Sequence, residues 1–218
     1  VKVDVELENN SIEHRVRVLF KTGIPSEFSI ADQQFGSIKR PTYLKEVENW
    51  RENGWNEKPR TIEPMQSFVT LKNENNGVVV FTDCVREYQI IGEELDTIAL
   101  TLFRSVPMMG KAELKDRPGR ASGMPWPTPD AQLLKKMNFN FAVKLYSNDE
   151  KINDIAVKAK EYLTPFIGYQ AAHFKNVDMF FLMNQPGEKN LPFEYSLFEF
   201  AGNNTVLSTV KKCEREDG

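Results

Sequence analysis

Alternation of apolar and polar residues with a period of two is the feature that most restricts how this chain can fold. It is clear in Val1–Leu7 and Val16–Phe20, and it returns in Phe139–Leu145. Successive side chains of a strand point to opposite faces, so each segment predicts a strand with one face against a core. Further β-rich runs predict strands at Ser67–Leu71, Val78–Phe81 and Ile98–Phe103. The expected fold class is mainly β.

One hairpin can be predicted in detail. Asn75-Asn76-Gly77 separates the run Phe68–Leu71 from the run Val78–Phe81. Asparagine and glycine readily adopt the positive φ that a tight hairpin turn needs. We therefore expect these two runs to pair antiparallel, with the positive φ supplied by this tripeptide.

One segment predicts a substantial helix. Apolar residues of Ile152–Leu163 recur on one helical face, Ser147 and Glu150 have the spacing of a capping box, and Pro165 would end the run. A crossover helix packed on the sheet is the expected role. Later aromatic runs predict more strands at Met179–Met183, Tyr195–Phe200 and Val206–Val210.

Composition limits the class of protein. The 218 residues include 40% hydrophobic ones, enough for the core of one large domain, and the net charge of −3 provides no broad field for nucleic acid or an anionic membrane. No apolar run is long enough to span a bilayer or to form a signal peptide. Two cysteines, Cys84 and Cys213, are too few for a disulfide scaffold, so we expect a cytoplasmic location. The glycosylation sequons at Asn9 and Asn203 are interpreted as chance.

Motifs of known catalytic sites are missing from the sequence. His14 and His173 have no zinc-ligand spacing, and Gly119–Gly123 holds its serine one place too late for a nucleophile elbow. Neither a GxGxxG motif nor a P-loop occurs. We therefore predict no catalytic residue and no metal ligand in this chain.

Two long segments lack periodicity, Arg40–Pro64 and Met108–Asp130, and loops of such length are usually functional. The second contains the candidate carbohydrate contacts, which combine charged groups for hydroxyls with an aromatic face for a sugar ring: Arg117, Arg120, Trp126 and Asp130. The alternative is that both arginines hold the loop by binding backbone carbonyls while Trp126 covers the edge of the core.

Several pieces, in this order and spacing, carry a resemblance to a known family. They are His14–Phe20, Ala31–Gly36 with Arg40-Pro41, Gln66–Val69, Arg86–Tyr88, Leu100–Ser105, Arg117–Arg120 and Thr128–Gln132. Together they resemble the C-terminal β domain of glycoside hydrolase family 38 α-mannosidases of the bacterial type, similar to mannosylglycerate hydrolase. Cys84 departs from the pattern, because a glycine-like turn residue is expected there.

The resemblance implies a large antiparallel β-sandwich, a supersandwich like that of galactose mutarotase, with one or two short helices. Residues 1–218 would form one domain of a longer, zinc-dependent, retaining α-mannosidase. Zinc and the aspartate nucleophile would lie in an absent N-terminal α/β-barrel domain. This chain would support that catalytic domain and form part of the wall of the mannoside site.

Alternatives stay open. The chain could be an independent carbohydrate-binding module that uses Trp126 or the loop of Trp50 and Trp55. It could also be a mutarotase with a histidine acid or base, although only His14 and His173 are available. The chain could also form a homo-oligomer. If the protein is cut after Gly218, the strand expected at Val206–Val210 would have an unpaired edge that is prone to self-association.

Overall fold

The computed structural model describes residues 1–168, 195–196, 198–199, 201, 207 and 209–214. Contacts divide the chain into two units, Val1–Leu163 and Thr164–Gly218. The strand expected at Met179–Met183 lies outside the described residues. The described members of Tyr195–Phe200 and Val206–Val210 are not in strands, so the strand prediction is wrong for them.

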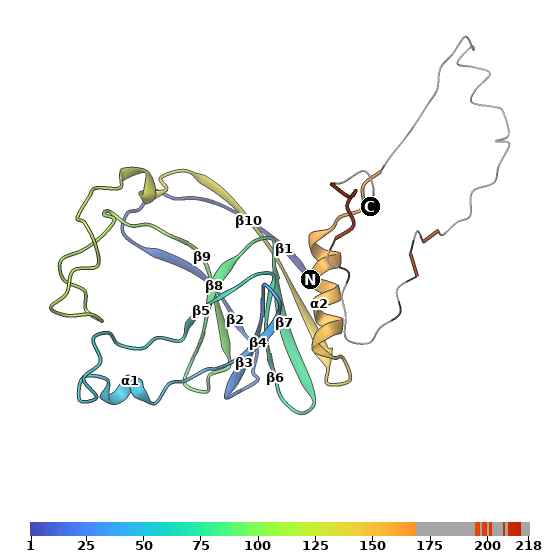
Figure 1. Ribbon diagram of the computed structural model, residues 1–218, viewed down its shortest axis with the longest axis horizontal. Coiled ribbons are helices and arrows are strands. Elements are labelled where there is room, and N and C mark those ends of the chain that lie inside the picture. Colours follow the sequence, from blue (N-terminus) through green and yellow to red (C-terminus); the bar gives the residue numbers. More distant parts are fainter. Residues whose placement is uncertain (169–194, 197, 200, 202–206, 208, 215–218) are drawn as a thin grey trace, which may run out of the picture. The chain divides into compact units, whose positions relative to one another are not determined.

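Two antiparallel sheets make up the first unit (Figure 1). The six-stranded sheet has the order β1 (Lys2–Glu8), β10 (Lys136–Ser147), β7 (Asn76–Thr82), β6 (Phe68–Lys72), β3 (Phe28–Gln33) and β4 (Gly36–Pro41). The four-stranded sheet has the order β2 (Arg15–Lys21), β9 (Thr97–Arg104), β8 (Arg86–Ile91) and β5 (Ile62–Met65). The predicted mainly β, antiparallel fold class is confirmed.

Apolar side chains from the facing sides of both sheets form the core. One cluster holds the fully buried side chains of Met65 and Tyr88, and a second holds Phe139 and Phe141. Phe20 of β2 meets Phe141 of β10 edge to face, with ring centroids 5.4 Å apart. The period-two interpretation of β10 is thus confirmed for Phe139 and Phe141, which face the core, but it is wrong for Leu145, which is 76% exposed.

The predicted hairpin is confirmed, but the reason given for Gly77 is wrong. β6 and β7 pair antiparallel with Phe68 opposite Phe81. Gly77 has no positive φ; it lies in β7 opposite Tyr146, where a Cβ would stand 2.1 Å from Cζ of the tyrosine ring. The turn instead uses Asn73, whose Oδ1 accepts from the N–H groups of the two asparagines that follow Glu74, at 2.9 Å each.

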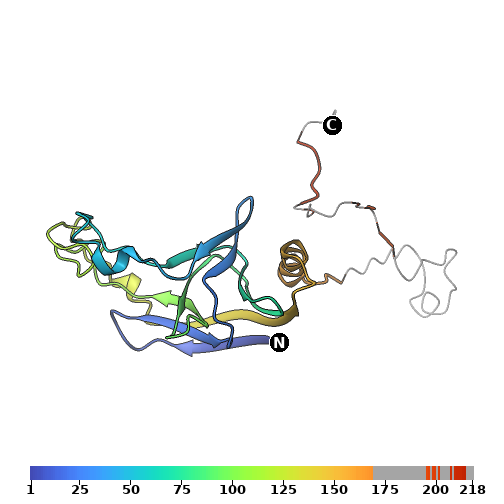
Figure 2. The same cartoon turned by 90° about the horizontal axis from the view of Figure 1, so that it is seen from below.

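The helix prediction is confirmed with the same bounds, as α2 (Ile152–Leu163). Ile155 and Ala159 are buried against the outer face of the six-stranded sheet, beside which α2 is seen nearly end-on in Figure 2. The helix therefore has the packing role expected from the sequence. No helix in the described part of the chain is long and apolar enough to cross a membrane.

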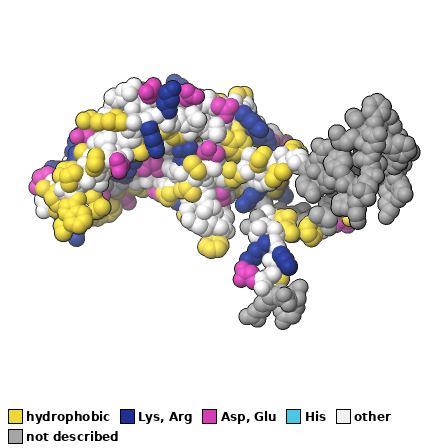
Figure 3. Space-filling model, turned by 90° about the horizontal axis from the view of Figure 1, so that it is seen from above, with side chains coloured by type: hydrophobic (Ala, Val, Ile, Leu, Met, Phe, Trp, Pro, Cys, Tyr) yellow, Lys and Arg dark blue, Asp and Glu magenta, His cyan; other side chains and the backbone are white. Residues whose placement is uncertain are grey.

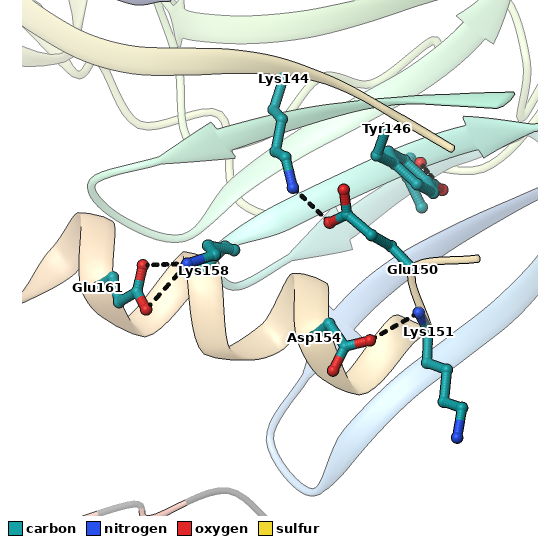
Figure 4. A network of polar contacts seen from close by, with 8 residues as sticks. Lys144, Tyr146, Glu150, Lys151, Asp154, Lys158 and Glu161 are labelled. Carbon is teal, nitrogen blue, oxygen red and sulfur yellow. Dashed lines mark hydrogen bonds and ion pairs between the residues drawn. The ribbon is translucent and has the colours of Figure 1, made fainter. Parts of the chain in front are cut away.

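The predicted capping box is wrong in its residues. Ser147 ends β10, and the side chain of Glu150 forms an ion pair with Lys144 (Figure 4). The N–H of Lys151 donates instead to the carboxylate of Asp154 at 2.8 Å. Asp154 therefore supplies the reciprocal half of a cap one turn later than the sequence spacing indicated.

Candidate functional site

Two long loops lie side by side at one end of the sandwich (Figures 1 and 2). The first loop, residues 42–61, joins β4 to β5 and contains α1 (Glu46–Asn49). The second loop, residues 105–135, joins β9 to β10 and contains the 3-10 helix η1 (Pro129–Gln132). They correspond closely to the two aperiodic segments of the sequence.

The two loops are tied together through Asp116 and Arg117. The N–H of Lys58 donates to the carbonyl of Asp116 at 2.7 Å, and Arg60 Nε donates to the Asp116 carboxylate at 3.0 Å. Arg117 Nη1 lies 3.7 Å from a carboxylate oxygen of Glu57. The tip of the second loop is thus braced by three neighbouring residues of the first.

The second loop is an irregular hairpin. Its limbs meet in a bridge between Met108 and Pro127, and the N–H of Met109 donates to the carbonyl of Trp126 at 2.9 Å. Gly110 packs so closely on Gly123 that a Cβ at 110 would stand 2.6 Å from a backbone carbon of Gly123. Glycine is needed at 110 because the two backbones are in contact.

Buried polar groups hold the base of the second loop. Asn9 Nδ2 donates to the carbonyls of Gln132 and Leu133 at 2.9 and 3.1 Å. The Ser105 hydroxyl accepts from the N–H of His14 at 3.0 Å and lies 3.2 Å from its Nδ1. Both ends of the loop are therefore fixed to the connection between β1 and β2, and His14 has a structural contact.

Arg117 has the contacts of a residue that holds the loop. Its Nη2 donates to the carbonyl of Ala121 at 2.8 Å, in addition to the ion pair with Glu57. Its Nε is buried and has no hydrogen-bond partner. These contacts match the alternative considered from the sequence, in which Arg117 holds the loop by binding a backbone carbonyl.

The other three candidates are exposed. Arg120 follows Gly119, which has a φ of +73°, and within the described residues its guanidinium has no hydrogen bond or ion pair. Trp126 is 60% exposed on the returning limb. Asp130 lies exposed in η1. The structure places all four candidates on the second loop but shows no contact among them.

Exposed apolar side chains gather at this end of the sandwich (Figure 3). They include Trp55, Met109, Met124 and Trp126. Trp55 is 45% exposed, whereas Trp50 is only 7% exposed beside the Arg51 guanidinium. Trp50 is therefore a packing residue, and Trp55 is the tryptophan of the first loop that could contact a ligand.

A cavity of about 370 Å³ lies at the base of the second loop. Its polar lining residues are Glu13, Ser105, Lys111 and Ser122, and none of the four candidates lines it. This volume is at the lower end of the range for small-molecule sites. Sequence reasoning missed these residues, because isolated lysine, serine and glutamate residues form no recognisable motif.

One titratable group of the first loop has a shifted pKa. The pKa of Tyr43 in the first loop is raised, chiefly because its hydroxyl donates to the carboxylate of Glu48 and the hydrogen bond favours the neutral phenol. The described residues contain no group of three or more His, Cys, Asp or Glu side chains that could hold a metal ion. These residues therefore offer no ligand set for a zinc ion.

Comparisons with known proteins point to one family. The family model of the glycosyl hydrolases family 38 C-terminal domain matches residues 1–110. A relative from Halalkalibacterium halodurans, described as a putative mannosylglycerate hydrolase, is 26% identical over 211 residues. The match covers 97% of this chain and 20% of the relative. The chain thus spans about a fifth of the length of this relative.

Two solved structures from Enterococcus faecalis are similar. An α-mannosidase has a TM-score of 0.60 at 26% identity, covering 75% of this chain and 16% of that protein. A protein of glycosyl hydrolase family 38 has a TM-score of 0.61 at 25% identity, covering 81% of this chain and 18% of that protein. Since the family model matches half of the sequence, the chain belongs to glycosyl hydrolase family 38, as a C-terminal β domain.

Proposed function

We propose that this chain is the non-catalytic C-terminal β portion of a zinc-dependent, retaining α-mannosidase, and that its paired loops form part of the wall of the mannoside site. The family match and the names of the relatives support the class of enzyme. In the longer protein, an N-terminal domain would hold the zinc, the carboxylate nucleophile and the acid of a double displacement. The contribution of this chain is to pack against that domain and to position sugar contacts.

Arg120 carries this proposal. Its guanidinium is exposed and has no partner among the described residues, yet it stands on a loop tip that Arg117 and Asp116 brace. A charged group on a braced loop binds a ligand with a smaller loss of conformational entropy than one on a free loop. We assign sugar contact to Arg120, with Trp126 offering an aromatic face, and loop support to Arg117.

The proposed substrate is an anionic mannoside. The name of the Halalkalibacterium relative refers to mannosylglycerate, whose glycerate group carries a carboxylate. A guanidinium binds a carboxylate through two parallel hydrogen bonds, which a lysine cannot reproduce. Arg120 is therefore the group that we expect to face the aglycone.

The test is kinetic and uses the longer enzyme. Arg120→Ala should lower kcat/KM for mannosylglycerate roughly ten- to hundredfold, the effect of losing a charge-assisted hydrogen bond, and should affect neutral p-nitrophenyl α-mannoside less. Lys115→Ala, at an exposed position of the same loop, is the matched control and should change neither value. Unchanged kinetics in the Arg120 variant would exclude the wall role of this residue.

An independent carbohydrate-binding module is the second candidate, favoured by the exposure of Trp55 and Trp126. Exposed tryptophans bind the apolar face of a pyranose. Isothermal titration of the 218-residue chain with mannose and manno-oligosaccharides separates the two functions. A wall that is completed only by the catalytic domain should give no saturable heat, whereas a module should give a binding isotherm.

The proposal includes a cytoplasmic location. Cys84 and Cys213 are both exposed and free in the structure, as expected for a protein of a reducing compartment. Although Cys84 is exposed, partial desolvation of its sulfur raises the pKa of the thiol, which lowers its thiolate fraction and hence its reactivity. Labelling of both thiols in protein isolated under non-reducing conditions would support this location.

A further inference from the structure

An open groove lies where β1 begins, between the ends of the two sheets. Its volume is about 510 Å³, and most of its lining is apolar: Val1, Phe20, Val78, Val143 and Leu145, with Lys21, Thr22 and Lys144 completing it. Val1 is 91% exposed and Leu145 is 76% exposed. Leu145 is thus an apolar residue of an interior strand of the sheet, and no described residue covers its side chain.

The strand register explains why Leu145 is uncovered. β1 and β10 pair antiparallel with Lys2 opposite Ala142, and Val1 exchanges two hydrogen bonds of 2.8 Å with Val143. β10 continues to Ser147, beyond the beginning of β1. On the β1 side, no described strand lies beside Lys144–Ser147, while β7 pairs with these residues on the other side.

Backbone groups at this edge point toward the vacant side. In an antiparallel ladder, alternate residues direct both their N–H and C=O to the same neighbour. Because Val143 bonds to Val1, Leu145 directs its N–H and C=O to the β1 side. Lys144 and Tyr146 direct theirs to β7. An unpaired strand edge with an apolar groove beside it is a template for another strand.

We propose that this groove takes a polypeptide segment that continues β1 in the N-terminal direction, antiparallel to β10, in a longer form of the chain. The register specifies its geometry: the residue two places before Val1 would stand opposite Leu145. The Halalkalibacterium relative, whose match covers 97% of this chain at 26% identity, is about five times as long, so a similar domain occurs within a longer polypeptide. A continuing strand also satisfies both backbone groups of Leu145, which a small apolar ligand cannot do.

The alternation of β1 specifies the side chains of that segment. Val3, Val5 and Leu7 pack against the core, and Val1 lines the groove with the same parity. The residue two places before Val1 therefore points into the groove, beside Leu145 and Phe20, and should be apolar. The residue immediately before Val1 points to the opposite face.

The experiment adds three residues before Val1 in the 218-residue chain. Thr-Ile-Thr places its isoleucine in the groove, whereas the permuted extension Thr-Thr-Ile has the same composition and places it on the other face. Hydrogen exchange measured by NMR should show the Leu145 amide protected at least about tenfold in the first extension relative to the unextended chain. The Tyr146 amide, which faces β7, is the internal reference and should be protected in all forms.

Stability gives an independent measurement. Thr-Ile-Thr should raise the melting temperature by about 2–4 °C relative to Thr-Thr-Ile, because its isoleucine is removed from water. Leu145→Ser should abolish that difference while changing the unextended chain little, since Leu145 is exposed there. Equal melting temperatures with an unprotected Leu145 amide would overturn the proposal. An unextended chain that dimerises and that Leu145→Ser makes monomeric would also overturn it, in favour of a second copy as the occupant.

Discussion

The ring of Tyr146 lies over the backbone of Gly77, so close that a Cβ at position 77 would stand 2.1 to 2.4 Å from three atoms of the tyrosine side chain. The two residues are paired across β7 and β10. The tyrosine hydroxyl reaches beyond the glycine to the hydroxyl of Thr70 on β6, at 2.8 Å. Three adjacent strands are thereby connected by one side chain beneath α2.

Gly77→Ala should destabilise the chain by about 1–3 kcal/mol, because the added methyl group forces the buried ring or the strand to move. Urea unfolding measures the loss as a lower midpoint with an unchanged slope. Gly168→Ala is the control, since a Cβ there meets nothing within 4 Å. Equal effects of the two substitutions would show that glycine is not required at position 77.

Stability should fall at alkaline pH in a way that depends on Tyr146. Burial raises the pKa of its phenol, an effect that the hydrogen bond with Thr70 partly offsets. The unfolded phenol loses its proton first, near pH 10, so the folded state then holds more protons and the unfolding free energy falls as pH rises. The stabilisation is complete below about pH 10 and is lost as pH passes through the raised pKa.

Tyr146→Phe keeps the ring and removes the titrating group. It should cost about 0.5–1.5 kcal/mol at pH 7 through the lost hydrogen bond to Thr70. The unfolding free energy of this variant should fall less steeply above pH 10 than that of the parent chain. Tyr162, whose pKa burial also raises, remains in both proteins and accounts for a residual slope. Identical pH profiles of parent and variant would exclude Tyr146 as a source.

The brace between the loops predicts a change in mobility with little change in stability. Asp116→Asn weakens the ion pair with Arg60, and exposed pairs contribute only about 0–1 kcal/mol. Trypsin cleavage after Arg120 should nevertheless accelerate several-fold, because the tip is released from the first loop. Glu161→Gln removes an exposed ion pair on α2 and should leave cleavage at the tip unchanged. Equal cleavage rates in both variants would contradict the bracing role of Asp116.

Periodicity in the sequence predicted the elements that have one clear apolar face. β10 and α2 were recognised because their core-facing residues repeat every two or every 3.6 positions. Four strands were missed: β4 has nearly all of its residues exposed at the sheet edge, β5 is short and contains Pro64, and β3 and β8 each bury only two residues. Such strands form through pairing with neighbours and show little pattern of their own.

The candidate site was only partly predictable, for a related reason. The sequence directed attention to the second loop as a source of charged and aromatic groups, and the structure places all four candidates there. The separate roles of Arg117 and Arg120 depend on Glu57, a residue of the first loop, and on a carbonyl at Ala121. Contacts between residues that are 60 positions apart leave no local signal.

The central claim is that a braced loop presents Arg120 to a mannoside. Comparing Arg117→Ala with Arg120→Ala tests this claim most directly. Both variants are measured for kcat/KM on mannosylglycerate in the longer enzyme and for melting temperature in the 218-residue chain. We predict that Arg120→Ala lowers kcat/KM roughly ten- to hundredfold without changing the melting temperature, and that Arg117→Ala lowers the melting temperature by about 2–4 °C through its lost backbone hydrogen bond. The claim is contradicted if Arg120→Ala leaves kcat/KM at the parent value.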